Sequence, residues 1–223
     1  MKRILSLSLF IPILSFGQFT SIPDPYFEQA LINLGHDNVI DGQVLTANIN
    51  NIDSLTISQI SNTSVHPGNS QAYLDLTGIE DFKNLEYLYV DGHELTSLDV
   101  SNNTKLIILH CYNNQLTSLD VTNNVDLTEL YAWGNQLTNL NLLANTALIK
   151  LIVADNQLTS LNTSSLLSLE NFGISKNQLY GLDVSNNTNL LNFSCYNNQL
   201  TSLDISNNIF LNSLAVGDDW DDD

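Results

Sequence analysis

Apolar side chains recur along most of this chain at a fixed interval. Leu85 and Leu106 are 21 residues apart, and the same step continues without a gap to Leu211. Each of these leucines is followed by further apolar residues after three and five positions, and usually by an Asn after eight. In every repeat but the last, a leucine also follows after ten positions. The seven repeats begin at Leu85, Leu106, Leu127, Leu148, Leu169, Leu190 and Leu211. This self-similarity predicts a stacked architecture in which neighbouring repeats bury one another's apolar residues.

Alternation inside each repeat predicts a short β-strand. In Leu88-Tyr89-Val90, for example, the two apolar residues point to one side and Tyr89 to the other. We expect the strands of successive repeats to stack in parallel, with their apolar columns inside the coil. The following Asn falls where the chain turns away, and its amide group can bond to backbone groups that the turn leaves unpaired. This column runs from Asn114 to Asn198.

The second half of each repeat, such as residues 97–103, contains many Ser, Asn and Asp residues. These residues oppose a helix, so we expect extended chain and turns on the convex side and a parallel β-sheet on the concave face. Asp99 and Asp120, one repeat apart, are interpreted as turn residues and not as an acid–base pair. In the fourth repeat Ser165-Leu166 replaces the usual Asn-Asn pair, which predicts a different turn there.

One helix is predicted ahead of the repeats. Asp24 is a suitable N-cap, Pro25 suits the first helical position, and Glu28 favours the positive end of the helix. Gly35 is a stop signal. A helix at this place would cover the open N-terminal end of the solenoid. The residues expected on its buried face are Phe27, Ala30, Leu31 and Leu34.

The first residues have the pattern of a secretory signal peptide. Lys2 and Arg3 precede an apolar run, and small residues at Ser15 and Gly17 precede a cut at Gln18. No later stretch is long and apolar enough to cross a bilayer, so we expect a secreted or cell-surface protein. The predicted divisions are a signal peptide at 1–17, a cap and irregular first coil at 18–84 with a polar loop at 61–72, seven repeats at 85–217 and an acidic tail at 218–223.

The charge balance argues against one class of partner. Six Lys and Arg residues stand against 24 Asp and Glu residues, which gives a formal net charge of −18 at pH 7. A chain without a basic surface is not expected to bind nucleic acid or anionic lipid. The acidic residues of 218–223 are interpreted as a solvated tail. The last repeat has no cap after it, so its apolar residues are expected to form a weakly held edge.

Two stretches of the chain carry a family resemblance. They are residues 106–124, which contain the run N-N-Q-L-T-S-L-D-V-T-N-N, and residues 22–49, which begin with I-P-D-P-Y-F-E-Q-A-L. They resemble the repeats and the N-terminal cap of secreted bacterial leucine-rich-repeat proteins of the internalin-like group. The resemblance covers nearly all of the chain after the signal peptide. It implies a leucine-rich-repeat solenoid with a short N-terminal cap helix, located outside a bacterial cell and interacting with proteins or glycans.

No set of residues predicts catalysis. His110 and Cys111 are neighbours in a strand and therefore point to opposite faces. Cys111 and Cys195 occupy the same inward position four repeats apart, which predicts two buried free thiols. The four His residues are scattered, and Val39 breaks the alternation that a calcium loop at residues 37–42 would need. We therefore expect no enzyme, no cofactor and no metal site.

The outward strand positions of the first three repeats are rich in aromatic residues. Such rings are frequent anchors of interfaces and also suit stacking on sugars, although aromatic residues favour strands in any case. Asp91 and Glu129 flank them and favour a cationic or hydroxyl-rich partner. The candidate binding patch consists of Tyr87, Tyr89, His110, Tyr112, Tyr131 and Trp133. The predicted function is an extracellular module that binds a protein or a carbohydrate; the alternative is a structural or adhesion scaffold of a larger cell-surface protein.

Overall fold

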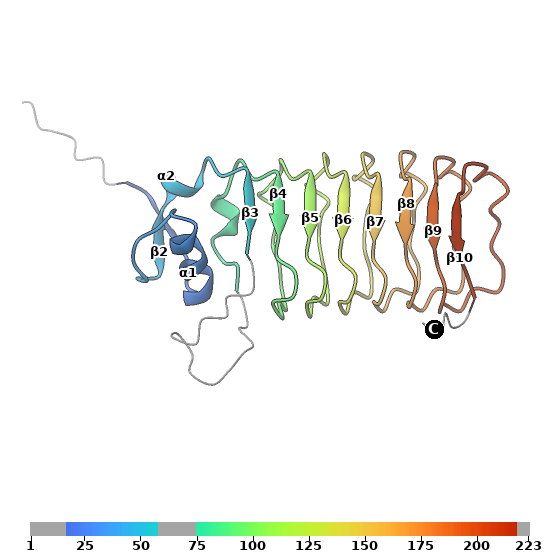
Figure 1. Cartoon of the computed structure of the whole chain (residues 1–223), viewed down its shortest axis with the longest axis horizontal. Helices are drawn as coiled ribbons and strands as arrows, with labels where there is room; N and C mark the ends of the chain where they lie inside the picture. The colour runs from blue at the N-terminus through green and yellow to red at the C-terminus, as the bar shows by residue number, and fades with distance from the viewer. Residues whose placement is uncertain (1–16, 58–74, 218–223) are drawn as a thin grey trace, which may run out of the picture.

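Eight parallel strands form one sheet in sequence order. A computed structural model describes residues 17–57 and 75–217, and Figure 1 shows the strands side by side in a single row. From β4 onward, paired residues are 21 positions apart, so that Leu88 lies beside Leu109. The strands are β3 (Ser54–Thr56), β4 (Tyr87–Tyr89), β5 (Ile108–His110), β6 (Glu129–Tyr131), β7 (Lys150–Ile152), β8 (Asn171–Gly173), β9 (Asn192–Ser194) and β10 (Ser213–Ala215). The predicted leucine-rich-repeat solenoid is confirmed.

Three predicted segments lie outside the described residues. They are the signal peptide up to residue 16, the polar loop at 61–72 and the acidic tail at 218–223. The divisions of the chain that depend on them stay predictions.

Neighbouring coils bury one another's apolar residues. In the first six repeats, the inward residues at the first, fourth and sixth positions are all buried. Where Phe172 and Phe193 replace leucines, their rings stack on each other with centroids 5.3 Å apart and an interplanar angle of 6°. Complete burial of one such side chain contributes about 1.5–3 kcal/mol. Because a single coil cannot bury these residues alone, each coil depends on the next for its stability.

The Asn column after the strands joins neighbouring coils, as predicted. The Nδ2 of Asn156 donates to the backbone oxygen of Ala132 at 3.0 Å and to that of Val153 at 3.2 Å. Its Oδ1 accepts a hydrogen bond from the backbone nitrogen of Leu137 at 2.9 Å. Equivalent bonds are made by Asn114, Asn135, Asn177 and Asn198.

His93 occupies this column in the first repeat. Its Nε2 lies 2.6 Å from the backbone oxygen of Ile57, and a carbonyl oxygen can only accept, so Nε2 carries the hydrogen. The imidazole is buried. The side chain of His93 therefore bonds to the irregular coil that contains β3. The hydrogen bonds of Asn114 and the later Asn residues of this column do not reach that coil.

A second Asn column lies on the convex side and was not predicted. The Nδ2 of Asn124 donates to the backbone oxygens of Val100 and Asn103 at 3.1 and 2.8 Å. The Asn124 side chain is buried. Equivalent bonds are made by Asn103, Asn145, Asn187 and Asn208. The sequence analysis assigned the polar residues of this half-repeat to extended chain and turns, and it gave these Asn residues no separate role.

Leu166 replaces the convex Asn in the fourth repeat without changing the turn. Its backbone nitrogen donates to Thr163 O at 2.9 Å, as the equivalent Asn does in other repeats. The prediction of a different turn is therefore wrong. Two hydroxyl groups supply polar contacts in place of the missing amide. Ser165 Oγ donates to Leu142 O at 3.4 Å, and Thr163 Oγ1 donates to Asn187 Oδ1 at 2.9 Å.

The convex side consists of extended chain and turns, and residues 85–217 contain no helix. Asp99 Oδ1 accepts a hydrogen bond from Ser101 N at 2.9 Å, and Asp120 Oδ1 accepts one from Thr122 N at 2.9 Å. Hydrogen bonds from the side chain and backbone of Ser101 lower the pKa of Asp99. The interpretation of these carboxylates as turn residues is confirmed.

The N-terminal cap contains the predicted helix. Asp24 Oδ1 accepts from the backbone nitrogens of Tyr26 and Phe27 at 2.7 and 3.0 Å, which caps the helix. Leu34 is exposed, contrary to the prediction, because it follows the last helical residue. The elements of the cap are β1 (Phe19–Ser21), α1 (Pro25–Asn33), β2 (Gln43–Leu45) and α2 (Thr46–Ile49), and β1 pairs with β2 in antiparallel fashion.

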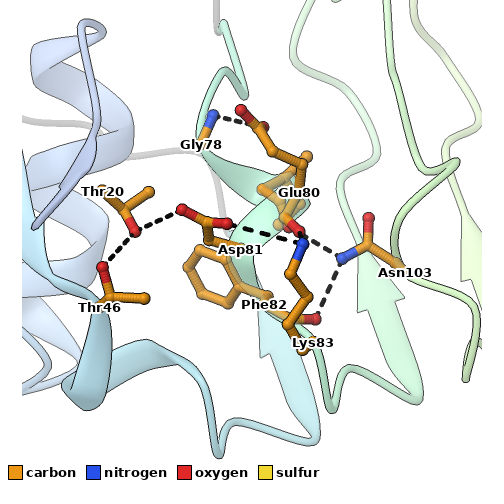
Figure 2. Close-up of polar contacts among 9 residues, drawn as sticks. Thr20, Thr46, Gly78, Glu80, Asp81, Phe82, Lys83 and Asn103 are labelled. Carbon is orange, nitrogen blue, oxygen red and sulfur yellow. Dashed lines mark hydrogen bonds and ion pairs between the residues drawn. The ribbon is translucent and has the colours of Figure 1, made fainter. Parts of the chain in front are cut away.

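Figure 2 shows polar contacts that join the cap to the first coils. Thr20 Oγ1 lies 2.9 Å from Thr46 Oγ1 and donates to Asp81 Oδ2 at 2.8 Å. Asp81 ends the 3₁₀ helix η1 (Ile79–Asp81). Asn103 Nδ2 donates to Ile79 O at 2.8 Å, so η1 is held from the cap on one side and from the first regular repeat on the other.

The cap approaches η1 closely at one glycine. Gly78 has a φ of +105°, and a Cβ atom there would lie 2.5 Å from the backbone oxygen of Ser21. Beside this contact, Phe27 of α1 and Phe82 stack with ring centroids 6.0 Å apart. The cap thereby covers the N-terminal end of the core.

We expect Asn156→Ala to lower the free energy of unfolding far more than Gln157→Ala. Removal of the buried amide leaves backbone groups of two coils without hydrogen-bond partners. Each unpaired group lowers the free energy of unfolding by about 1–3 kcal/mol. Gln157 is the exposed neighbour and serves as the control. Urea denaturation of both variants measures the difference, and equal unfolding free energies would contradict the role assigned to the column.

The two cysteines are free and buried, as predicted. Burial raises the pKa of Cys111 to about 12 and that of Cys195 to about 11. We expect neither thiol to react with iodoacetamide at neutral pH in the folded protein, because the thiolate is the reactive form. Four strand steps separate them by about 19 Å, too far for a disulfide. Peptide mapping checks both statements, and a Cys111–Cys195 disulfide would contradict the register of the sheet.

Candidate functional site: an aromatic patch on the sheet

The register of the sheet brings the predicted aromatic residues into rows. Tyr89, His110 and Tyr131 pair directly with one another across β4, β5 and β6. Two positions further along the chain, Tyr112 and Trp133 form a second row. We call these five residues together with Tyr87 the aromatic patch. Their side chains are partly buried and partly accessible.

Five of the six side chains form one connected cluster of rings. The ring centroids of Tyr89 and His110 are 4.8 Å apart, and those of His110 and Tyr131 are 4.3 Å apart. Tyr112 and Trp133 stack face to face, with centroids 4.7 Å apart and an interplanar angle of 8°. The sixth residue, Tyr87, lies one row away and pairs with Ile108. Tyr112 and Trp133 therefore cover one face of each other, whereas Tyr89 and His110 meet edge to face at 83°.

Charged groups border the patch on two sides. Glu129 Oε1 accepts a hydrogen bond from Lys150 Nζ at 3.0 Å. This hydrogen bond and the charge of Glu129 raise the pKa of Lys150. Desolvation raises the pKa of Tyr112, and a hydrogen bond to Asp91 raises it further. The sequence analysis named both carboxylates as flanking residues but missed their partners, which lie 21 residues further on at the same position of the next repeat.

His110 lies at the centre of the ring cluster as a neutral imidazole. Desolvation lowers its pKa, although the charges of Glu129 and Asp91 oppose this effect. Its Nε2 is buried and has no hydrogen-bond partner among the described residues. The tyrosine rings on either side therefore surround an imidazole that carries no charge near neutral pH.

The other half of the same face has a different character. Asn192 Nδ2 donates to Asn171 Oδ1 at 2.7 Å, and the hydroxyl oxygens of Ser175 and Ser194 are 2.6 Å apart. Ser175 is only 2% exposed. The outward face thus divides into an aromatic half over β4 to β6 and a half over β8 to β10 in which Tyr196 stands among mostly small or polar residues.

Among residues 17–57 and 75–217, the fold does not bring together the other candidate residues of the sequence analysis. Cys111 and Cys195 lie in the core, on the opposite side of the sheet from the patch. Asp37 Oδ1 accepts from Asn38 N, and Asp41 Oδ1 from Gln43 N, as in ordinary turns. In the described parts of the chain, no three His, Cys, Asp or Glu residues come together in a way that would hold a metal ion. The described helices include none with the length and apolar character to cross a membrane.

Solved structures with a similar fold come from bacterial leucine-rich-repeat proteins. The functional domain of InlJ from Listeria monocytogenes, which includes a cysteine ladder, has a TM-score of 0.78 and 30% identity over 92% of this chain and 44% of that one. An internalin, InlF, from the same species has a TM-score of 0.67 and 22% identity over 92% of this chain and 66% of its own. The chain has the internalin fold.

More distant internalin-like structures extend the comparison. A leucine-rich-repeat protein from Leptospira interrogans has a TM-score of 0.51 and 22% identity over 71% of this chain and 51% of that chain. The present chain spans less than half of the InlJ structure and less than two thirds of InlF. No protein-family model and no curated protein matches it. Internalin-like folds generally mediate protein binding.

We expect the stability of the protein to depend on the protonation of His110. Burial lowers the pKa of this residue in the folded protein, whereas the unfolded chain binds the proton near pH 6.5. As the pH falls through about 6.5, the unfolded state takes up the proton first, so folding stability is lost.

The free energy of unfolding is measured at about pH 7.5 and at about pH 5.5, one value above and one below the ordinary pKa of histidine. His110→Gln should lose less stability than the wild-type protein over this interval, since all other titrating groups are shared. Equal losses in the two proteins would show that the ring cluster does not disfavour the imidazolium.

Proposed function

We propose that the chain is an extracellular, non-enzymatic binding module whose partner, a protein or a glycan, contacts the aromatic patch on the concave face. The ring cluster on three consecutive strands carries this proposal. Aromatic rings that already pack on one another lose little conformational entropy when a partner binds, and such rings are common energetic centres of interfaces. Over β8 to β10, Tyr196 is a single aromatic residue among mostly small or polar ones, and no cluster of rings comparable to the patch is formed there.

The packing of the rings favours a protein partner over a glycan. A sugar stacks on the face of an aromatic ring, but Tyr112 and Trp133 cover each other's faces at an angle of 8°. His110 is likewise enclosed between Tyr89 and Tyr131. Stacking therefore leaves each ring of this pair at most one face for a sugar, while its edges are not covered by the stacking partner. Ring edges suit the apolar and carbonyl groups of a protein surface.

The charge of the module suits a cationic or neutral partner. The chain has a formal net charge of −18, and the one Lys beside the patch is paired with Glu129. A nucleic acid would be repelled by such a surface. The signal-peptide pattern at residues 1–17 supports a location outside the cell.

A structural or adhesion scaffold of a larger cell-surface protein is the second candidate. The observation in its favour is the exposed apolar character of residues 209–216, where Ile209, Phe210, Leu214 and Val216 are all accessible. In a scaffold the repeats act as a spacer, and the aromatic patch is ordinary strand composition.

We expect a Tyr131→Ala/Trp133→Ala variant to lose binding, while Asn171→Ala/Asn192→Ala retains it. Both pairs lie on the same face of the sheet, but only the first removes rings from the patch. The purified protein is first screened against arrays of extracellular proteins and of glycans. Affinities of the wild type and of both variants for each ligand found are then measured by calorimetry.

Several outcomes separate the hypotheses. Loss of at least about 2 kcal/mol in the first variant alone, the range of an interface hot spot, supports the proposal. Selective capture of glycans would assign the patch to carbohydrate. Equal affinity of the folded aromatic variant and the wild type would contradict a role of the patch and favour the scaffold. Circular dichroism confirms that each variant is folded.

A further inference from the structure

The N-terminal cap contains a hollow that lies apart from the aromatic patch. This cap hollow has a volume of about 370 Å³ and is formed by β1, β2, α2 and the loop that joins α1 to β2. Figure 1 shows the cap at the N-terminal end of the row of strands, ahead of β4 to β6, which carry the patch. The wall of the cap hollow includes Phe19, His36, Asp37, Val39, Leu45 and Asn48.

The loop in this wall is fixed at both ends. Glu28 of α1 is only 1% exposed, and its Oε1 accepts hydrogen bonds from the backbone nitrogens of residues 41–43 at 2.8 to 3.0 Å. At the start of the loop, the backbone nitrogens of Gly35 and His36 both donate to carbonyl oxygens of α1 at 2.9 Å. Asn48 Nδ2 of α2 donates to His36 O at 3.1 Å. A partner would therefore not have to order this loop on binding, which removes one of the ordinary costs of association.

One carboxylate oxygen in the wall lacks a donor. Asp37 Oδ1 accepts from Asn38 N at 2.8 Å, but Asp37 Oδ2 is buried and has no hydrogen-bond partner among the described residues. The cap itself offers no basic side chain, since residues 17–57 contain five Asp and Glu residues and no Lys or Arg. A carboxylate oxygen that is shielded from water and unpaired is unfavourable. A cationic donor in the cap hollow would relieve this cost.

The wall suits an organic cation better than a metal ion. In the described chain, the His and Asp side chains of the wall do not come together in a way that would hold a metal ion. Phe19 is exposed, and the face of an aromatic ring attracts a guanidinium group. Val39 and Leu45 offer apolar surface to the methylene stem of a long basic side chain. A guanidinium can stack on a ring and bond to a carboxylate such as Asp37 with the same planar group, which an ammonium cannot do.

We propose that the cap hollow receives an arginine side chain of a partner protein, with its guanidinium at Asp37 and Phe19. This second contact goes beyond the proposed function and does not depend on the aromatic patch. The same loop carries exposed apolar residues, since Leu34, Val39 and Ile40 are 44 to 50% exposed. A free arginine would leave these side chains in water, whereas apolar residues next to an arginine in a partner chain would bury them.

Titration of the full chain with two blocked amino acids tests the charge requirement. N-acetyl-arginine amide carries the guanidinium, and N-acetyl-citrulline amide has nearly the same shape without the charge. We expect the arginine compound to shift the backbone amide NMR signals of Asn38 and Gly42 in a saturable manner, and the citrulline compound to bind several-fold more weakly. Equal binding of the two compounds, or no saturable shift with arginine, would overturn the proposal.

Asp37→Asn is the diagnostic variant. Its side-chain oxygen can still accept from Asn38 N, so the turn is kept while the negative charge is lost. Asp53→Asn removes the same charge from an exposed position of the cap outside the cap hollow and is the matched control. We expect only Asp37→Asn to weaken binding of N-acetyl-arginine amide, by several-fold. Equal affinities of the two variants would contradict the role of Asp37, and unchanged amide signals elsewhere in the chain establish that both are folded.

Blocked tripeptides distinguish a protein segment from a free cation. A tripeptide with leucine on both sides of arginine should bind more tightly than one with serine on both sides, and Val39→Ser/Ile40→Ser should remove the difference. Equal affinity of the two tripeptides for the wild type would overturn the assignment to a partner protein and leave a site for a small guanidinium compound. Tyr131→Ala/Trp133→Ala should bind every probe as the wild type does, so this test can fail or succeed independently of the proposed function.

Discussion

A turn of the backbone can be buried in this protein only because amide side chains bond to it. The chain reverses direction twice in every coil, and each reversal leaves backbone nitrogens and oxygens pointing into the interior. Asn156 on one side and Asn124 on the other supply donors for these oxygens, and Asn156 also supplies an acceptor. Leaving a buried backbone group unpaired costs about 1–3 kcal/mol, so the apolar columns could not close around the turns without these residues.

Much of the fold could be predicted because the same constraint acts in every repeat. Seven copies of one apolar pattern determine the strand positions, the register and the direction of stacking, whatever the other residues are. Asp24 and Gly35 likewise mark the ends of the cap helix by local chemistry. The convex Asn column was missed for a physical reason, because a polar residue in a polar run shows no sign of burial. The turn of the fourth repeat was mispredicted because it keeps its shape without the usual Asn. There the hydroxyl of Thr163 donates to Asn187 of the next coil, a hydrogen bond that the local sequence does not predict.

The composition of the aromatic patch could be predicted, but not its internal geometry. Residues 21 positions apart must lie on adjacent strands, so the spacing in the sequence was enough to predict which aromatic residues form rows. Whether two rings stack or meet edge to face depends on side-chain rotamers, which a strand pattern does not determine. Tyr112 and Trp133 stack, whereas Tyr89 and His110 meet at 83°. This difference decides which ring surfaces remain available, and so changes the kind of partner that fits.

The bonds of the convex Asn column reach back 21 and 24 residues, always to the preceding coil. A duplication or deletion of one whole repeat would therefore recreate every such bond at the new junction, while any other change of length would break them. Because the repeats have the same length, gain or loss of one whole repeat keeps the register of all the others. Thr163 and Leu166 lie within the same repeat and would be copied together. The length of the sheet is thus open to rapid evolutionary change, in steps of one strand.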